Sequence, residues 1–105
     1  MKFRNLLAAA LAAPLFSVFS AGVALAQAKP IKIGFSMALT GGLAGAGKAA
    51  LIGMEIWRDD VNKHGGLLGR PVVFVYYDDA TQPAKVPAQY TQLFDVDKVE
   101  LVVSC

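Results

Sequence analysis

Apolar residues occupy every second position in residues 31–37 (IKIGFSM), from Ile31 to Met37. A period of two is typical of a β-strand with one apolar face, so this segment predicts the first strand. Residues 38–47 (ALTGGLAGAG) are rich in glycine and show no regular pattern. They predict a loop whose backbone can take unusual angles or approach another group closely.

A helix is predicted from about residue 47 to residue 64, because apolar residues recur there at helical spacing. Gly65 and Gly66 follow it, and glycine adopts without strain the left-handed conformation that ends many helices. The apolar stripe of this helix is expected to face the core. It consists of Ala50, Met54, Trp57 and Val61.

Residues 72–77 (VVFVYY) form an uninterrupted apolar run rich in β-branched and aromatic residues. Such a run suits a strand that is buried on both faces, as in a parallel sheet. Pro83 then opens a second predicted helix, in which Pro87 must fall in the first turn or delay the start. Residues 99–103 (VELVV) predict a third strand.

The order of these elements, β-α-β-α-β with short connections, predicts a three-layer α/β unit with a parallel sheet. Ligands bind to such sheets at the edge formed by the carboxyl ends of the strands. Residues 38–47 and the segment that begins at Ser104 would lie at that edge. The third strand stops at Ser104 and Cys105, where an α/β sheet normally continues, so we expect the chain to be the first part of a longer protein.

Residues 1–26 have the three parts of a secretory signal peptide. Lys2 and Arg4 form its basic start, an apolar centre follows, and residues 24–26 (ALA) fit the A-x-A pattern with cleavage after residue 26. Cleavage after residue 28 fits nearly as well. An uncleaved anchor is the alternative, but the many alanines and a proline make this segment a weak membrane span. No cysteine lies near the cleavage site, so we expect an exported protein without a lipid anchor.

The formal net charge of +2 is due to Lys2 and Arg4, because the other residues carry eight basic and eight acidic side chains. The neutral balance after the leader gives no reason to expect a nucleic-acid partner. Cys105 is the one cysteine, so no internal disulfide can form, although an exported protein could hold one.

The glycine-rich segment invites a nucleotide-site interpretation. Gly42 to Lys48 reads G-x-x-x-x-G-K, as in a P-loop, but Ala49 stands where Ser or Thr must hold Mg²⁺. An exported protein also meets little ATP. A dinucleotide-like pattern from Gly45 to Ala50 starts too far from the strand and lacks an acidic residue at the expected distance. Both matches fit a glycine-rich loop better than a nucleotide site, and no cofactor is expected.

The remaining reactive residues each have a structural interpretation that we favour. His64, at a helix C-terminus, is placed where its partial positive charge is favourable. Asp78 and Asp79 could bind a metal or transfer protons, but with Thr81 they suit the backbone of a strand-to-helix turn better. Cys105 has no base in evidence that would make it a reactive thiol. We therefore expect no catalytic residue and no metal ligand, and a protein that is not an enzyme.

Four segments carry a resemblance that covers nearly all of the chain after the leader. They are LTGG after the first strand, the stretch GMEIWRDDVNKHGGLLGRPV, then YYDDATQP, and the closing DKVELVVS. Together and in this order, they resemble the amino-terminal part of the branched-chain amino acid and amide class of ABC-importer substrate-binding proteins.

This resemblance implies a type I periplasmic binding fold, in which two α/β lobes close on a small ligand. Residues 27–105 would form the amino-terminal portion of the first lobe, with the first strand between the second and the third. The implied function is capture of an amino-acid-like, amide or carboxylate ligand in the periplasm and its delivery to a membrane ABC permease. The same lobe architecture also serves ligand-sensing domains of signalling proteins, an alternative that these residues leave open.

In the resembled proteins, the first lobe holds the polar head of the ligand with N–H and hydroxyl groups at the carboxyl ends of its strands. Some members place an aromatic residue where this chain has Ala46, which leaves space for a bulkier ligand, and some have a cysteine where it has Thr81. The residues that we expect to bind the ligand are Leu43, Ala46, Gly47, Ser104 and Cys105.

Overall fold

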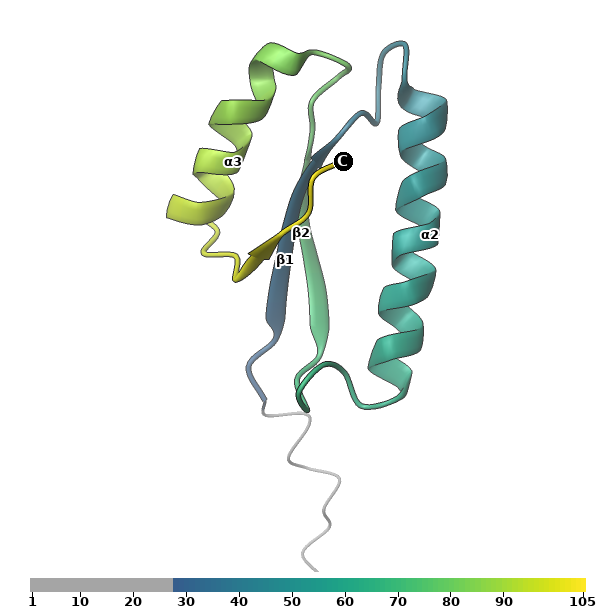
Figure 1. Cartoon of the computed structure of the whole chain (residues 1–105), viewed down its shortest axis with the longest axis vertical. Coiled ribbons are helices and arrows are strands. Elements are labelled where there is room, and N and C mark those ends of the chain that lie inside the picture. Colours follow the sequence, from purple (N-terminus) through teal and green to yellow (C-terminus); the bar gives the residue numbers. More distant parts are fainter. Residues whose placement is uncertain (1–27) are drawn as a thin grey trace, which may run out of the picture.

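The computed structural model describes residues 28–105 (Figure 1). They contain a three-stranded parallel sheet with the strand order β2-β1-β3. The strands are β1 (Ile31–Met37), β2 (Val72–Asp78) and β3 (Leu101–Val102). The signal peptide expected over residues 1–26 lies outside the described residues.

Helices cover both faces of this sheet (Figure 1). One face carries α2 (Ala44–Lys63), and the other carries α3 (Val86–Asp95), which continues from the short 3-10 turn η1 (Pro83–Lys85). The predicted α/β order and its three layers are confirmed. Pro87 lies in the first turn of α3. The backbone N–H that proline lacks would have no acceptor within the helix at this position, so no helical hydrogen bond is lost. Within residues 28–105, no helix is both long enough and apolar enough to cross a bilayer.

β1 is the centre of the sheet and of the core. It pairs with β2 along its whole length, from Ile31 opposite Val72 to Met37 opposite Asp78. Every residue of β1 except Lys32 is buried. A strand with neighbours on both edges and helices on both faces has little surface left for water.

The two faces of β1 are filled in different ways. On the α2 side, the ring of Phe35 is fully buried and stacks on Tyr76, with 5.0 Å between the ring centroids. On the α3 side, Gly34 has no side chain, and the side chains of Val99 and Leu93 occupy the space above its backbone. A Cβ built on Gly34 would lie 3.0 Å from Val99 and 3.1 Å from Leu93. The α3 layer therefore packs directly on the backbone of β1.

A side-chain bridge holds α2 against β2. Asn62 Nδ2 donates to the carbonyl oxygen of Val72 at 2.9 Å, and Asn62 Oδ1 accepts from the amide of Val72 at 2.7 Å. The helix ends as predicted, since Gly65 and Gly66 both have positive φ and the amide of Gly66 donates to Val61 O at 2.9 Å.

The start of α2 differs from the prediction. The helix begins at Ala44, so residues 44–47, expected to be loop, form its first turn. Within that turn, the amide of Gly47 donates to the carbonyl oxygen of Leu43 at 3.0 Å. The amide of Leu43 is itself held by Thr81 Oγ1 at 3.1 Å. This tertiary contact outweighs the low helix propensity of the glycines in the segment.

The expectation that Trp57 packs in the core is wrong. Its side chain is 44% exposed, and none of the residues of α2 is buried. The indole stacks on Phe74 at 6.4 Å between centroids, at the rim of the sheet. β3 is short, with two paired residues, Leu101 and Val102, instead of the five predicted over residues 99–103. The described sheet therefore does not bury the apolar stripe of α2 completely.

Candidate functional site

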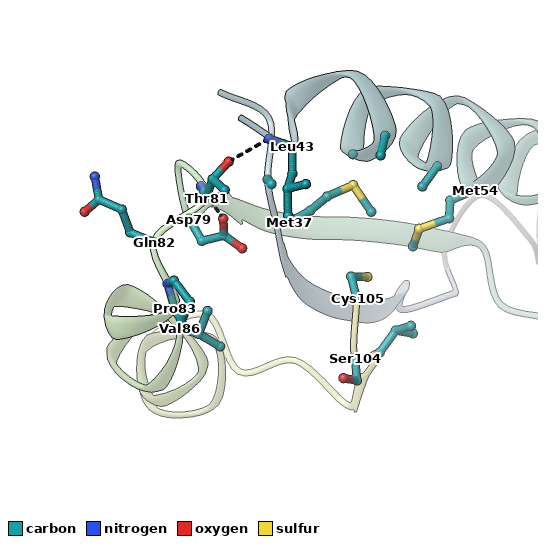
Figure 2. Close-up of a pocket in the computed structure, with 15 residues that line it drawn as sticks. Met37, Leu43, Met54, Asp79, Thr81, Gln82, Pro83, Val86, Ser104 and Cys105 are labelled. Atoms are coloured by element: carbon teal, nitrogen blue, oxygen red, sulfur yellow. Dashed lines mark hydrogen bonds between the residues drawn. The ribbon is translucent and has the colours of Figure 1, made fainter. Parts of the chain in front are cut away.

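A cavity of about 660 Å³ opens at the carboxyl edge of the sheet. It lies between the end of β1, the first turns of α2, the turn after β2, the start of α3 and the residues that follow β3 (Figure 2). Open α/β sheets bind ligands at this edge. Its wall is largely apolar. The polar residues in the wall are Asp79, Thr81, Gln82, Ser104 and Cys105.

The five residues expected to contact a ligand all line this cavity. Leu43 immediately precedes α2, whereas Ala46 and Gly47 lie inside its first turn and not in a loop. Ser104 and Cys105 follow β3 and approach the same space from another side (Figure 2). Two segments that are distant in the sequence thus meet at one cavity.

Several wall residues were not foreseen. Met54 was assigned to the core stripe of the helix, but its side chain lines the cavity, as does that of Met37 at the end of β1. Pro83 and Val86 close the cavity from the start of η1 and α3. The position of these last two residues, directly after a strand-to-helix turn at the carboxyl edge, was the signal that could have indicated them.

Gly47 is required by a close backbone approach. A Cβ built at this position would collide with the carbonyl oxygen of Ala38. Gly45, two residues earlier in the same turn, has nothing within 4 Å of such a Cβ. The residue at position 47 must therefore be glycine if the segment after β1 is to lie against α2.

Asp78 fastens the segment after β1 to the turn after β2. Its Oδ1 accepts from the amides of Leu39 at 2.9 Å and Ala80 at 2.7 Å, and its Oδ2 accepts from Thr40 Oγ1 at 2.6 Å. The hydroxyl of Thr40, followed by these amides, lowers the pKa of the Asp78 carboxyl from 3.8 to about 2. The Asp78 carboxylate accepts hydrogen bonds that hold the turn in place, and Asp78 is not among the residues that line the cavity.

Asp79 and Thr81 complete this connection. Asp79 Oδ1 accepts from the amide of Thr81 at 2.8 Å, and Thr81 Oγ1 donates to Thr40 O at 2.8 Å. These bonds, together with those of Asp78, confirm that Asp78 and the Oδ1 atom of Asp79 accept hydrogen bonds that hold the turn. Ala80 and Thr81 both have positive φ, which makes this a strained turn held by side-chain hydrogen bonds.

The first turn of α2 gives the cavity wall N–H donors. The first amides of a helix have no acceptor within the helix, and they carry a partial positive charge. No acidic residue lies in the first turn of α2 to neutralise it. Ala46, which lines the cavity, belongs to this turn, whereas the amide of Gly47 already donates to the carbonyl oxygen of Leu43.

Two further reactive side chains, His64 and Cys105, lie far apart in the sequence and have different surroundings. His64 caps the far end of α2, with Nδ1 2.8 Å from the carbonyl oxygen of Asp60. Partial burial raises the pKa of the Cys105 thiol, which favours its unreactive protonated form. Residues 28–105 contain no cluster of three or more His, Cys, Asp or Glu side chains that could hold a metal ion.

Comparison with known proteins agrees with this geometry. Residues 30–105 match the family model of the periplasmic binding proteins. The chain belongs to this family. Periplasmic binding proteins are substrate-binding proteins that work outside the cytoplasm, and the type I α/β architecture described above is theirs. No curated protein matches the chain significantly.

Among solved structures, the chain is similar to substrate-binding proteins of ABC transporters. The substrate-binding protein LivJ of a branched-chain amino acid transporter from Streptococcus pneumoniae, solved with isoleucine, is 34% identical with a TM-score of 0.67. A fatty acid ABC transporter substrate-binding protein from Thermomonospora curvata is 32% identical with a TM-score of 0.65. An ABC transporter substrate-binding protein from Sphaerobacter thermophilus is 31% identical with a TM-score of 0.64.

The similarity covers most of this periplasmic binding protein chain but a small part of the others. Each of the three alignments includes 70% of this chain. They include 21%, 18% and 19% of the respective solved chains. The chain therefore spans about a fifth of the length of the structures that it matches.

Proposed function

We propose that this protein is the extracytoplasmic solute-binding component of an ABC importer. It captures a small amino acid, amide or organic acid and delivers it to a permease in the membrane. It performs no chemistry on the ligand. Its signal peptide, residues 1–26 with cleavage after residue 26, or after residue 28 in the second register, directs export and leaves no lipid anchor.

The observation that carries this proposal is the cavity at the carboxyl edge of the sheet. Its mostly apolar wall suits the hydrocarbon part of a small solute, and the N–H groups at the start of α2 suit a polar head. Leu43, Ala46 and Gly47 on one side and Ser104 and Cys105 on the other would contact the ligand. Ala46, with its single methyl group, leaves room for the body of the ligand.

The names of the similar structures support the same class of ligand. One was solved with isoleucine, and another is described as a fatty acid transporter protein. Both solutes combine an apolar body with a small polar head. A cavity with a largely apolar wall and a few polar groups fits that combination.

Titration calorimetry of the protein expressed from its complete reading frame tests the proposal. The panel consists of amino acids, their amides, aromatic and aliphatic acids, and ATP. We expect at least one of the organic solutes to bind and ATP not to bind. Binding of ATP alone would overturn the proposal.

Two tryptophan substitutions test the place of the site. Ala46→Trp fills the cavity and should weaken binding more than tenfold, or about 1.4 kcal/mol. Ala49→Trp is the matched control, because Ala49 is exposed on the same helix and does not line the cavity. If Ala46→Trp keeps the wild-type affinity, the first turn of α2 does not contact the ligand.

A further inference from the structure

One carboxylate oxygen in the cavity wall, Oδ2 of Asp79, has only a distant hydrogen-bond donor among the described residues. Asp79 lines the cavity at the turn after β2, beside Thr81 (Figure 2). Its Oδ1 accepts from the amide of Thr81 at 2.8 Å. For Oδ2, the one donor among the described residues is the hydroxyl of Ser36, at 3.4 Å. That distance is well beyond the 2.5–3.0 Å of a good O–H···O bond, so this bond is at best weak.

The hydroxyl of Ser36 is engaged elsewhere. A serine hydroxyl has one hydrogen to donate, and Gln89 Oε1 lies closer, at 2.7 Å. The orientation of the Gln89 amide is fixed by its other end, since Nε2 donates to Asp78 O at 2.9 Å. The hydrogen of Ser36 therefore goes to Gln89. Asp79 Oδ2 is left as an acceptor without a donor from residues 28–105.

The charge of the wall strengthens this conclusion. Asp79 is the one charged residue that lines the cavity in the described part of the chain, and no Lys, Arg or His stands beside it there. A carboxylate in such a place is stabilised by a hydrogen-bond donor, above all by a cationic one. A second carboxylate brought to the same spot is repelled, since like charges disfavour each other's ionised form.

We propose that Asp79 determines which ligands this site accepts. Its Oδ2 accepts a hydrogen bond from the ammonium group of an amino acid or the NH₂ group of a primary amide. Ligands that offer a carboxylate and no donor, such as fatty acids and simple organic acids, bind poorly. This inference rests on the proposed function and narrows its ligand class to solutes that carry an N–H donor.

Two series of matched probes distinguish the effect of an N–H donor on affinity from the effect of the hydrocarbon body. One series is isoleucine, 3-methylpentanamide and 3-methylpentanoate, and the other is phenylalanine, 3-phenylpropanamide and 3-phenylpropanoate. Each series keeps one hydrocarbon body and changes the polar group. In titrations of the protein expressed from its complete reading frame, we expect the amino acid or the amide to bind at least about tenfold more tightly than the acid of its series.

The variant Asp79→Asn tests the role of the carboxylate. Asparagine can still accept from the amide of Thr81, but it offers an NH₂ group in place of the free oxygen. The preference for donor-bearing probes should fall to about even or reverse in favour of the acids. Asp95→Asn is the control, because it removes the same charge from an exposed position at the end of α3 and should keep the wild-type preference.

The outcomes are distinguishable. If no probe of either series binds to the wild-type protein, the proposed ligand class and this inference both fall. If the probes bind but the wild-type protein prefers the acids, or Asp79→Asn keeps the wild-type preference, this inference alone falls. The comparison of probes on the wild-type protein needs no variant, so it decides the question even if Asp79→Asn does not fold.

Discussion

Thr40 and Asp78 are joined by two hydrogen bonds that connect the segment after β1 to the end of β2. Thr40 Oγ1 donates to Asp78 Oδ2 at 2.6 Å, and the Thr40 amide donates to Oδ1 at 3.2 Å. The turn that these bonds fix also carries Asp79 and Thr81 into the cavity wall. The shape of the candidate site therefore depends on a carboxylate that does not line it.

Acid should weaken this connection. The hydroxyl of Thr40, and then the amides of Leu39 and Ala80, lower the pKa of Asp78 from 3.8 to about 2. A carboxyl whose pKa is lower in the folded state stabilises the fold above its unfolded pKa, and this contribution is lost as the pH falls toward the folded value. We expect the melting temperature to fall between pH 4 and pH 2, and to fall less in Asp78→Asn.

The control for this measurement is Asp59→Asn. Asp59 is exposed and pairs with the neighbouring Arg58, so its removal should leave the acid slope of the melting temperature unchanged. Equal slopes in wild type and Asp78→Asn would show that Asp78 does not carry the acid sensitivity.

Two glycines in the first turn of α2 should differ sharply. Gly47→Ala places a methyl group against the carbonyl oxygen of Ala38, so either the segment after β1 or the helix must move. Both line the cavity, and we expect lower stability together with at least a tenfold loss of ligand affinity. Gly45→Ala meets no atom within 4 Å, so it should keep the wild-type affinity and should not lower the stability. Equal behaviour of the two variants in calorimetry and thermal melts would refute the close approach.

Gly34 in the core and Gly53 on the exposed surface of α2 form a second pair. Gly34→Ala brings a methyl group within 3.0–3.1 Å of Val99 and Leu93, and overpacking of this kind costs about 1–3 kcal/mol. Gly53→Ala lies on α2 with nothing within 4 Å, and it should stabilise the protein by about 0.5–1 kcal/mol. Denaturant unfolding of the protein from the complete reading frame measures both. A neutral Gly34→Ala would mean that α3 is less closely packed on β1 than described.

The sequence was sufficient for the elements that a local pattern specifies. The alternation in residues 31–37, the apolar run of β2 and the glycine pair after α2 gave the strands and the helix end correctly. The sequence was also sufficient to predict that residues 38–47 and the segment from Ser104 lie near each other, because the carboxyl ends of parallel strands share an edge. Residues of both segments line the same cavity.

Long-range contacts account for the errors. The start of α2 depends on the bond from the Leu43 amide to Thr81, a residue far along the chain that no local pattern reveals. The helical stripe showed that Trp57 and Met54 share a face, but a stripe does not tell how wide the sheet beneath it is. Likewise, the acceptor left open on Asp79 is visible only once Ser36 is seen to donate to Gln89.

The last prediction concerns β2, an edge strand of the described sheet. Its residues 72–77 (VVFVYY) have no charge and no proline, and such exposed edges pair with other chains. We expect residues 27–105, expressed alone, to self-associate and to melt without a sharp transition. Val73→Glu places a carboxylate opposite Lys32 of β1 and should reduce the association. Size-exclusion chromatography and circular dichroism melts decide the matter, and a wild-type monomer with a cooperative transition would contradict the prediction.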